Sequence, residues 1–362
     1  MLRRILAVTL CLLVAGCANI AYYAQAVEGQ MKLMAGTRPI PDVVNDAATD
    51  PKLRQQLERV IAIREFASSE LALPNNGSYR SYADLGRPFV VWNIFAAPEF
   101  SVEPQQWCML LVGCVNYRGY YDKNNADRFA GELSQEGMDV YVAGVPAYST
   151  LGYFKDPVLN TFLRFGDEEV AHIIFHELAH QLVYAEGDSA FNESFATTVE
   201  NEGMRRWLTR SATPERLRDF ETQQERKALF QRLVADSRDK LRGIYLSSLP
   251  PGEKRLAKME VFTEMKQNYA DLKAGWGGHG DYDRWFSQPL NNATLGSVAL
   301  YTQWVPAFQA LLEQEGRSLP RFYQRVAALA HLPKTERSAA LNQFLQSRTA
   351  PSVPSPNPLA FK

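Results

Sequence analysis

His176, Glu177 and His180 have the types and spacing of a zinc-hydrolase motif, H-E-x-x-H. Residues four apart on a helix share one face, so both imidazoles can reach a single metal ion. A zinc ion held by three protein ligands keeps one position for water, lowers the pKa of that water and polarises the substrate carbonyl. Glu177 follows the first histidine and is placed to take the proton of the water. The motif therefore predicts zinc-dependent hydrolysis, with peptide bonds as the expected substrate.

The motif has to lie on a helix, and the surrounding residues predict one. Asp167 is expected to start this helix, because aspartate is favoured at helix N-termini. An apolar stripe follows at helical spacing, made of Val170, Ile173, Ile174, Leu178 and Val183. This periodicity supplies the structural context that the motif requires.

His172 lies one turn before His176 and needs a separate assignment. On a helix, His172 and His180 would be about 12 Å apart, too far to share an ion bound at about 2.1 Å. Only the pair His176 and His180 has a glutamate directly after its first histidine. We therefore expect His172 to pack in the core or to form a hydrogen bond behind the metal ligands.

A third ligand is expected on the next helix, where Glu193 is the candidate. Gly187 suits the C′ position of the first helix, and Asp188 or Ser189 suits the N-cap of the second. Glu200 lies two turns beyond Glu193 and is expected to accept a hydrogen bond from a ligating imidazole, which would fix its tautomer. The alternative is that both glutamates are solvated surface carboxylates.

A longer zinc motif, H-E-x-x-H-x-x-G-x-x-H, does not fit the chain. Val183 stands at its glycine position and Glu186 at its last histidine position. Glu186 is therefore a minor alternative for the third ligand.

The arrangement resembles the glutamate zincins, such as thermolysin and the large zinc aminopeptidases, whose second helix carries a similar Asn-Glu motif after a longer connection. Further segments resemble the predicted aminopeptidase family of Gram-negative bacterial envelope proteins: 112–121, 144–152, 175–180, 191–196, 289–295 and 305–308, with Tyr301. This resemblance covers nearly the whole chain after the first residues. It implies a zinc metallopeptidase and favours an aminopeptidase.

A peptidase also needs a hydrogen-bond donor for the oxyanion of its tetrahedral intermediate. Tyr301 and Tyr148 are the candidates, because both lie in segments that resemble the family. The segment 146–152 follows a predicted strand and could pair with the substrate backbone as an edge strand. Tyr148 filling the core instead is an equally open alternative.

The N-terminus predicts export and a lipid anchor. Arg3 and Arg4 precede an apolar run at 5–14, which is too short to span a bilayer but fits a secretory signal. Its ending, Leu13-Val-Ala-Gly-Cys17, resembles a bacterial lipobox. This implies that Cys17 is lipid-modified, and Ala18 behind it favours the outer membrane, with the protein facing the periplasm. The alternative is an ordinary signal peptide with an incidental cysteine.

Two cysteines remain after the signal peptide and the lipidated Cys17, namely Cys108 and Cys114. An even pair in an oxidising compartment could form a short disulfide. Two buried thiols are an equally open alternative.

The composition indicates a globular protein with a large core. The chain has 362 residues, 46% of them hydrophobic, with 39 basic and 40 acidic side chains. The absence of a basic excess argues against nucleic acid as a partner, and no further apolar segment reaches membrane-spanning length. The expected partners are a peptide or protein substrate, and the membrane through the lipid anchor.

We expect an α+β, mainly helical fold in which the zinc helices pack on a small mixed sheet. Strands are predicted within 89–95, 107–117 and 138–143, and helices at 50–69, 125–136 and 292–316. The helix at 292–316 is expected to have Asn291 or Asn292 as its cap and a kink or break at Pro306.

The expected organisation along the chain has six parts. They are a signal peptide at 1–16, a lipid-anchored tether at 17–49 that includes a helix or tether up to about residue 41, a zincin-like catalytic core at 50–210, a helical hairpin at 211–275, a C-terminal helical part at 276–346 that completes the active site, and a Pro-rich flexible tail at 347–362.

Three functions stay open at this point. The first is an aminopeptidase with Glu177 activating a zinc-bound water, and the second is an endopeptidase of the cell envelope. The third is a lipid-anchored binding or assembly factor with a non-catalytic zinc. The motif argues against the third, because structural zinc sites usually close with four protein ligands.

Overall fold

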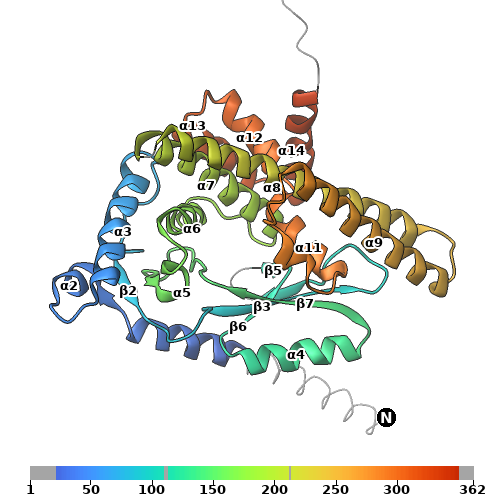
Figure 1. The fold of residues 1–362 in the computed structure, drawn as a ribbon, viewed down its shortest axis with the longest axis horizontal. Helices are drawn as coiled ribbons and strands as arrows, with labels where there is room; N and C mark the ends of the chain where they lie inside the picture. The colour runs from blue at the N-terminus through green and yellow to red at the C-terminus, as the bar shows by residue number, and fades with distance from the viewer. Residues whose placement is uncertain (1–21, 110–112, 212, 350–362) are drawn as a thin grey trace, which may run out of the picture.

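The computed structural model describes residues 22–109, 113–211 and 213–349 (Figure 1). The predicted signal peptide, Cys17 and the end of the Pro-rich tail lie outside these residues. The fold is α+β and mainly helical, which confirms the predicted class. No helix of the described residues is long and apolar enough to cross a membrane.

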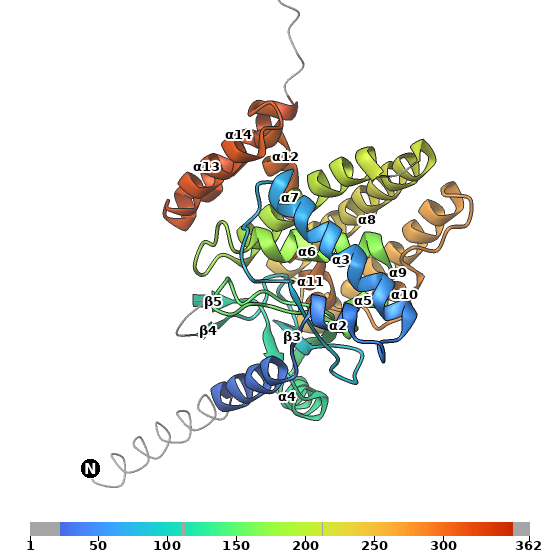
Figure 2. The same cartoon turned by 90° about the vertical axis from the view of Figure 1, so that its left-hand side faces the viewer.

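The main sheet has three antiparallel strands in the order β6-β3-β7. They are β6 (Arg118–Tyr120), β3 (Val91–Pro98) and β7 (Met138–Val145), with β3 and β7 paired along their whole length. Both views show this sheet between α4 (Lys123–Gln135) and the larger helical layer (Figures 1 and 2).

Strand β3 is buried along nearly its whole length because both of its faces are covered. Trp92, Ile94 and Ala96 pack on the side of α4, and Phe95 packs against α11 (Asn292–Thr302). Successive side chains of a strand point to opposite faces, so one strand serves two cores.

The stretch predicted as a strand at 107–117 is divided in the structure. β4 (Trp107–Met109) and β5 (Gly113–Val115) form a separate antiparallel pair. A third small sheet contains β1 (Arg38–Pro39), β2 (Ser81–Ala83) and β8 (Val158–Leu159), and β2 pairs parallel with β8.

The helical core contains α3 (Pro51–Ser69), α6 (Asp167–Ala179) and α7 (Ser189–Ser211). Asp50 caps α3 by accepting hydrogen bonds from the backbone of the first turn. Phe66 of α3 packs on Phe175 of α6 and Trp207 of α7, which joins the three helices. Two short helices, α2 (Ile40–Asn45) and α5 (Asn160–Leu163), lie beside them.

The predicted helical hairpin consists of α8 (Pro214–Leu246) and α9 (Pro251–Gly275), which lie side by side (Figure 1). It has its own aromatic cluster, in which the Phe230 ring stacks on Tyr282 and the Tyr269 ring stacks on Phe286 of α10 (Asp283–Phe286).

The C-terminal part contains α11, α12 (Val305–Gln314), α13 (Leu319–Ala330) and α14 (Lys334–Thr349). Of the two predicted caps of α11, Asn291 is the one that caps the helix. The predicted break is confirmed: Pro306 lies in the first turn of α12, where its missing N–H costs no helical hydrogen bond.

The segment expected to be a helix or a tether is a helix at 22–35. It packs along β6, where Arg118 lies over the Tyr22 ring and Gln25 hydrogen-bonds the backbone of Gly119 and Tyr121.

Candidate metal centre and substrate cleft

Two of the predicted metal ligands lie on helices, His176 on α6 and Glu193 on α7, and the third, His180, directly follows α6 at the start of the loop 180–188. The predicted role of Gly187 is wrong: α6 ends at Ala179, so Gly187 cannot be its C′ residue. The chain turns earlier because Asn192 hydrogen-bonds both the N–H and the C=O of Ala185, which fixes the loop instead of a longer helix. Asp188 occupies the capping position of α7, since its side chain accepts from the N–H of Phe191.

His176, His180 and Glu193 converge on one point and form a group that could hold a metal ion. The Nε2 atoms of the two histidines are 3.2 Å apart, and Oε2 of Glu193 lies 3.2 Å from His176 Nε2 and 3.6 Å from His180 Nε2. Ligands about 2.1 Å from a tetrahedral ion are about 3.4 Å from one another. The spacing and the two-nitrogen, one-oxygen donor set therefore fit zinc.

Glu200 orients His176 from behind. Its Oε2 lies 2.9 Å from His176 Nδ1 and its Oε1 lies 2.8 Å from His172 Nδ1. A proton on His176 Nδ1 leaves the Nε2 lone pair facing Glu193 and His180, as a metal ligand requires. Burial opposes ionisation of Glu200, but Lys227 and the two histidines outweigh it and hold its pKa well below the usual range.

The two other glutamates of the centre have opposite pKa shifts. Burial raises the pKa of Glu177 to about 7, although the charges of His176 and His180 counter part of the effect. Burial favours a higher pKa for Glu193 as well, but the charges and hydrogen bonds of His180 and His176 outweigh burial and lower the pKa of Glu193 to about 2. Glu193 is thus ionised, as a ligand must be, while Glu177 has the pKa that suits a general base near neutrality.

The centre opens into a cleft of about 390 Å³. Its walls come from the helix 22–35, from β3, β7 and the segment 146–151, and from α6, α7 and α11. Tyr301 lines this cleft from α11, with its ring centroid 6.4 Å from that of His176.

Tyr148 also lines the cleft, but its hydroxyl is engaged elsewhere. It lies 2.5 Å from the Tyr121 hydroxyl and hydrogen-bonds Gln30. This arrangement favours a wall-forming role for Tyr148.

Two further tyrosines of the cleft, Tyr117 and Tyr184, were not found as site residues from the sequence. The charge of Glu193 adds to the effect of burial in raising the pKa of both. Tyr117 lies in the family-like segment 112–121, which is the signal that could have identified it. No sequence signal could have identified Tyr184, because tertiary contacts determine the conformation of the loop that contains it.

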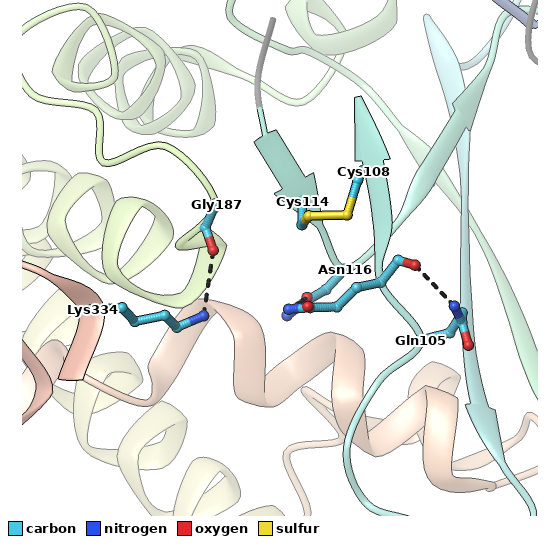
Figure 3. Close-up of a disulfide and its surroundings, with 7 residues drawn as sticks. Gln105, Cys108, Cys114, Asn116, Gly187 and Lys334 are labelled. Atoms are coloured by element: carbon cyan, nitrogen blue, oxygen red, sulfur yellow. Dashed lines mark hydrogen bonds between the residues drawn. A yellow bond between two sulfur atoms is a disulfide. The ribbon is translucent and has the colours of Figure 1, made fainter. Parts of the chain in front are cut away.

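The cysteine pair forms a disulfide, Cys108–Cys114, across β4 and β5 (Figure 3). This hairpin lies against the loop between the zinc-motif helices. Gly113 has a φ of 72°, and a Cβ there would lie 2.7 Å from the Glu186 side chain and 2.8 Å from the nitrogen of Gly187. Glu186 therefore packs on the hairpin, and it is not part of the metal-binding group of the described residues.

Comparison with protein families identifies one that covers most of the chain. A model of the family described as "Putative aminopeptidase" matches residues 21–341, most of the chain. Searches of the curated proteins and of the solved structures gave no match.

Proposed function

The chain belongs to the "Putative aminopeptidase" family, and on this basis we propose that it is a peptidase that uses zinc bound by His176, His180 and Glu193. The observation that carries the proposal is the convergence of these three donor atoms at the spacing of a tetrahedral zinc site, with Glu177 beside them. Three protein ligands leave a position for water, which distinguishes a catalytic site from a structural one.

Zinc, when bound, supplies Lewis-acid chemistry that activates water and polarises the scissile carbonyl. Glu177 accepts the proton of the attacking water at a carboxylate oxygen and then delivers it to the departing amine nitrogen. The C–O bond forms first and gives the tetrahedral oxyanion; the C–N bond then breaks, and the peptide yields a carboxylate and an amine. Tyr301 donates a hydrogen bond to the oxyanion; burial, with the charge of Glu193, holds its pKa well above 10 and keeps it protonated.

Zinc content and chelation test this function. Full-length protein in detergent is expected to bind one zinc per chain and to cleave unmodified peptides. Removal of the metal by a chelator should abolish cleavage, and added Zn²⁺ should restore it. Full activity without metal would contradict the proposal, and one bound zinc with no cleavage of any peptide would favour the binding factor.

We also propose that the protein is an outer-membrane lipoprotein facing the periplasm. The lipobox-like ending at Cys17 and the disulfide between Cys108 and Cys114 support this location, because disulfides persist in oxidising compartments. Mass spectrometry of the N-terminal peptide should find acyl chains on Cys17. An unmodified Cys17 in the membrane fraction, or a chain that still carries residues 1–16 there, would contradict the proposal.

A further inference from the structure

A second cavity of about 270 Å³ lies beside the substrate cleft. The two cavities share Ile173, His176, Glu177 and Tyr301. We refer to the 390 Å³ cavity as the large arm and to the 270 Å³ cavity as the small arm. Because Glu177 borders both arms, a peptide whose scissile bond lies at Glu177 has one arm on each side of that residue within reach.

Among the described residues, the only charged side chains that line the large arm belong to the catalytic centre. Apart from the metal-binding group and Glu177, its described lining is apolar, hydroxyl or amide, and includes Val91, Val145 and Leu151. A charged side chain buried there would lose its hydration without gaining an ion pair, which disfavours charged side chains at this position. The large arm suits bulky uncharged side chains.

The small arm is charged, and one of its charges is unpaired. Its ionisable lining outside the catalytic pair consists of Glu169, His172, Glu200 and Lys227. Glu200 is bound by both histidines, and Lys227 lies 3.9 Å from it, so these groups largely neutralise one another. Glu169 is exposed and has no ion pair with any residue that the structure describes.

The two acidic neighbours of Glu169 differ from it in this respect. Asp167 pairs with Arg59, and Glu168 pairs with Arg216. Neither lines the small arm. Glu169 is thus the one acidic side chain of the first turn of α6 that is both unpaired and turned to the cleft.

Helix geometry sets how far Glu169 lies from the scissile bond. Glu169 and His176 are seven residues apart on α6, on the same face, which is about 10 Å along the axis. An extended peptide covers about 3.3–3.6 Å per residue, so this separation corresponds to two or three substrate residues. The amine of the residue that contributes the scissile carbonyl could not reach Glu169 over this separation.

We propose that Glu169 binds the terminal ammonium group of the substrate in the small arm, so that the enzyme releases di- or tripeptides from free N-termini. The residue after the scissile bond is then bulky and uncharged, because it enters the large arm. This inference rests on the proposed peptidase function and makes Glu169 a residue that determines where cleavage occurs.

Product analysis tests the inference on zinc-loaded full-length protein. Hexapeptides with free and acetylated N-termini are digested, and the first products are identified by mass spectrometry. Di- or tripeptides should be released first, and acetylation should lower kcat/KM by about tenfold or more, the value of a lost charge-assisted hydrogen bond. Release of single residues, or equal cleavage of acetylated peptides as an endopeptidase would show, would overturn the inference.

Two matched variants test whether the preference for free amines depends on the carboxylate of Glu169. Glu169→Gln should lower kcat/KM for the free-amine peptides to the level of the acetylated ones. Glu168→Gln removes the adjacent charge, which pairs with Arg216 outside the small arm, and should leave the preference for free amines unchanged. An unchanged preference in Glu169→Gln would overturn the assignment.

A binding measurement separates this inference from the proposed function. Trialanine hydroxamate, which binds zinc without being cleaved as a substrate, is compared with its N-acetyl derivative by calorimetry. The wild type should bind the free-amine form about tenfold or more tightly, and Glu169→Gln should bind both alike. This result without peptide cleavage would keep ammonium binding by Glu169 and refute the peptidase, and with it the release of di- or tripeptides. Cleavage without any binding preference would refute the inference alone.

Discussion

The Nδ1 atom of His176 lies 2.9 Å from Oε2 of Glu200, two turns along α7 from Glu193, the proposed third metal ligand. One helix therefore supplies both a ligand and the group that orients a second ligand. Partners of this kind hold the imidazole ring and its tautomer and raise its basicity.

Glu200→Gln should weaken zinc binding about 10- to 100-fold, because the shape of the side chain is retained while its charge is lost. Competition with a chromogenic chelator measures the affinity. His172→Gln serves as the control: it leaves the pair of Glu200 and His176 in place and should change the affinity much less. An unaltered zinc Kd in Glu200→Gln would mean that His176 does not depend on this contact.

Asn192 precedes Glu193 and fixes the loop before it through two hydrogen bonds to Ala185, of 2.7 and 2.9 Å. Asn192→Ala leaves both backbone groups of Ala185 unsatisfied in a buried position. We expect the free energy of unfolding to fall by about 2–4 kcal/mol and zinc affinity to fall with it, as Glu193 loses its support.

Urea denaturation with and without zinc measures both effects. Thr198→Ala is the control, because it removes one buried hydrogen bond within α7, to the backbone of Ser194, and should cost about 1 kcal/mol. Equal losses of zinc affinity in the two variants would argue against a specific role for Asn192.

Arg337 of α14 forms a buried ion pair with Asp188, 2.6 Å long, directly before α7. Arg337→Met should destabilise the protein by about 3–5 kcal/mol, because it leaves the carboxylate of Asp188 buried without its partner. Lys334→Met is the matched control: Lys334 is exposed and 4.0 Å from Asp188, so its loss should cost less than about 1 kcal/mol. Denaturation midpoints that rank the two variants in the opposite order would contradict this account.

The disulfide closes a loop with a sequence separation of six, and the strands that it joins contribute Met109 and Val115 to the large arm. The double variant Cys108→Ser/Cys114→Ser should lose about 2 kcal/mol of stability, the chain-entropy value for so short a loop. We also expect a higher KM, because these side chains lose their fixed position in the cleft. Treatment of the wild type with a reductant should reproduce both effects, and unchanged KM in both cases would exclude a role of the hairpin in substrate binding.

Local signals were sufficient for much of the fold and for placing His176 and His180 side by side. Asp50 and Asn291 cap their helices because capping depends on the next few residues only. The spacing of His176 and His180 likewise predicts a shared face. The end of α6 could not be predicted, because it depends on the contact of Asn192 with Ala185 rather than on Gly187.

Contacts between distant parts of the chain explain what the sequence did not indicate. The Tyr148 hydroxyl is bound by Gln30, 118 residues away, so its engagement could not be read from its own segment. The pair of Arg337 and Asp188 spans 149 residues. The sequence also left open whether Glu193 is solvated or lies beside His176 and His180. The packing of α7 on α6 places it beside the two histidines.

Glu177→Gln tests the central claim most directly, because it removes the proposed base while keeping the size of the side chain and all three metal-binding residues. Zinc content and peptide turnover are measured on the same preparation. The account predicts one zinc per chain, as in the wild type, with turnover lowered by about 10²- to 10⁴-fold, the usual contribution of a general base. Turnover equal to that of the wild type at equal zinc content would contradict it.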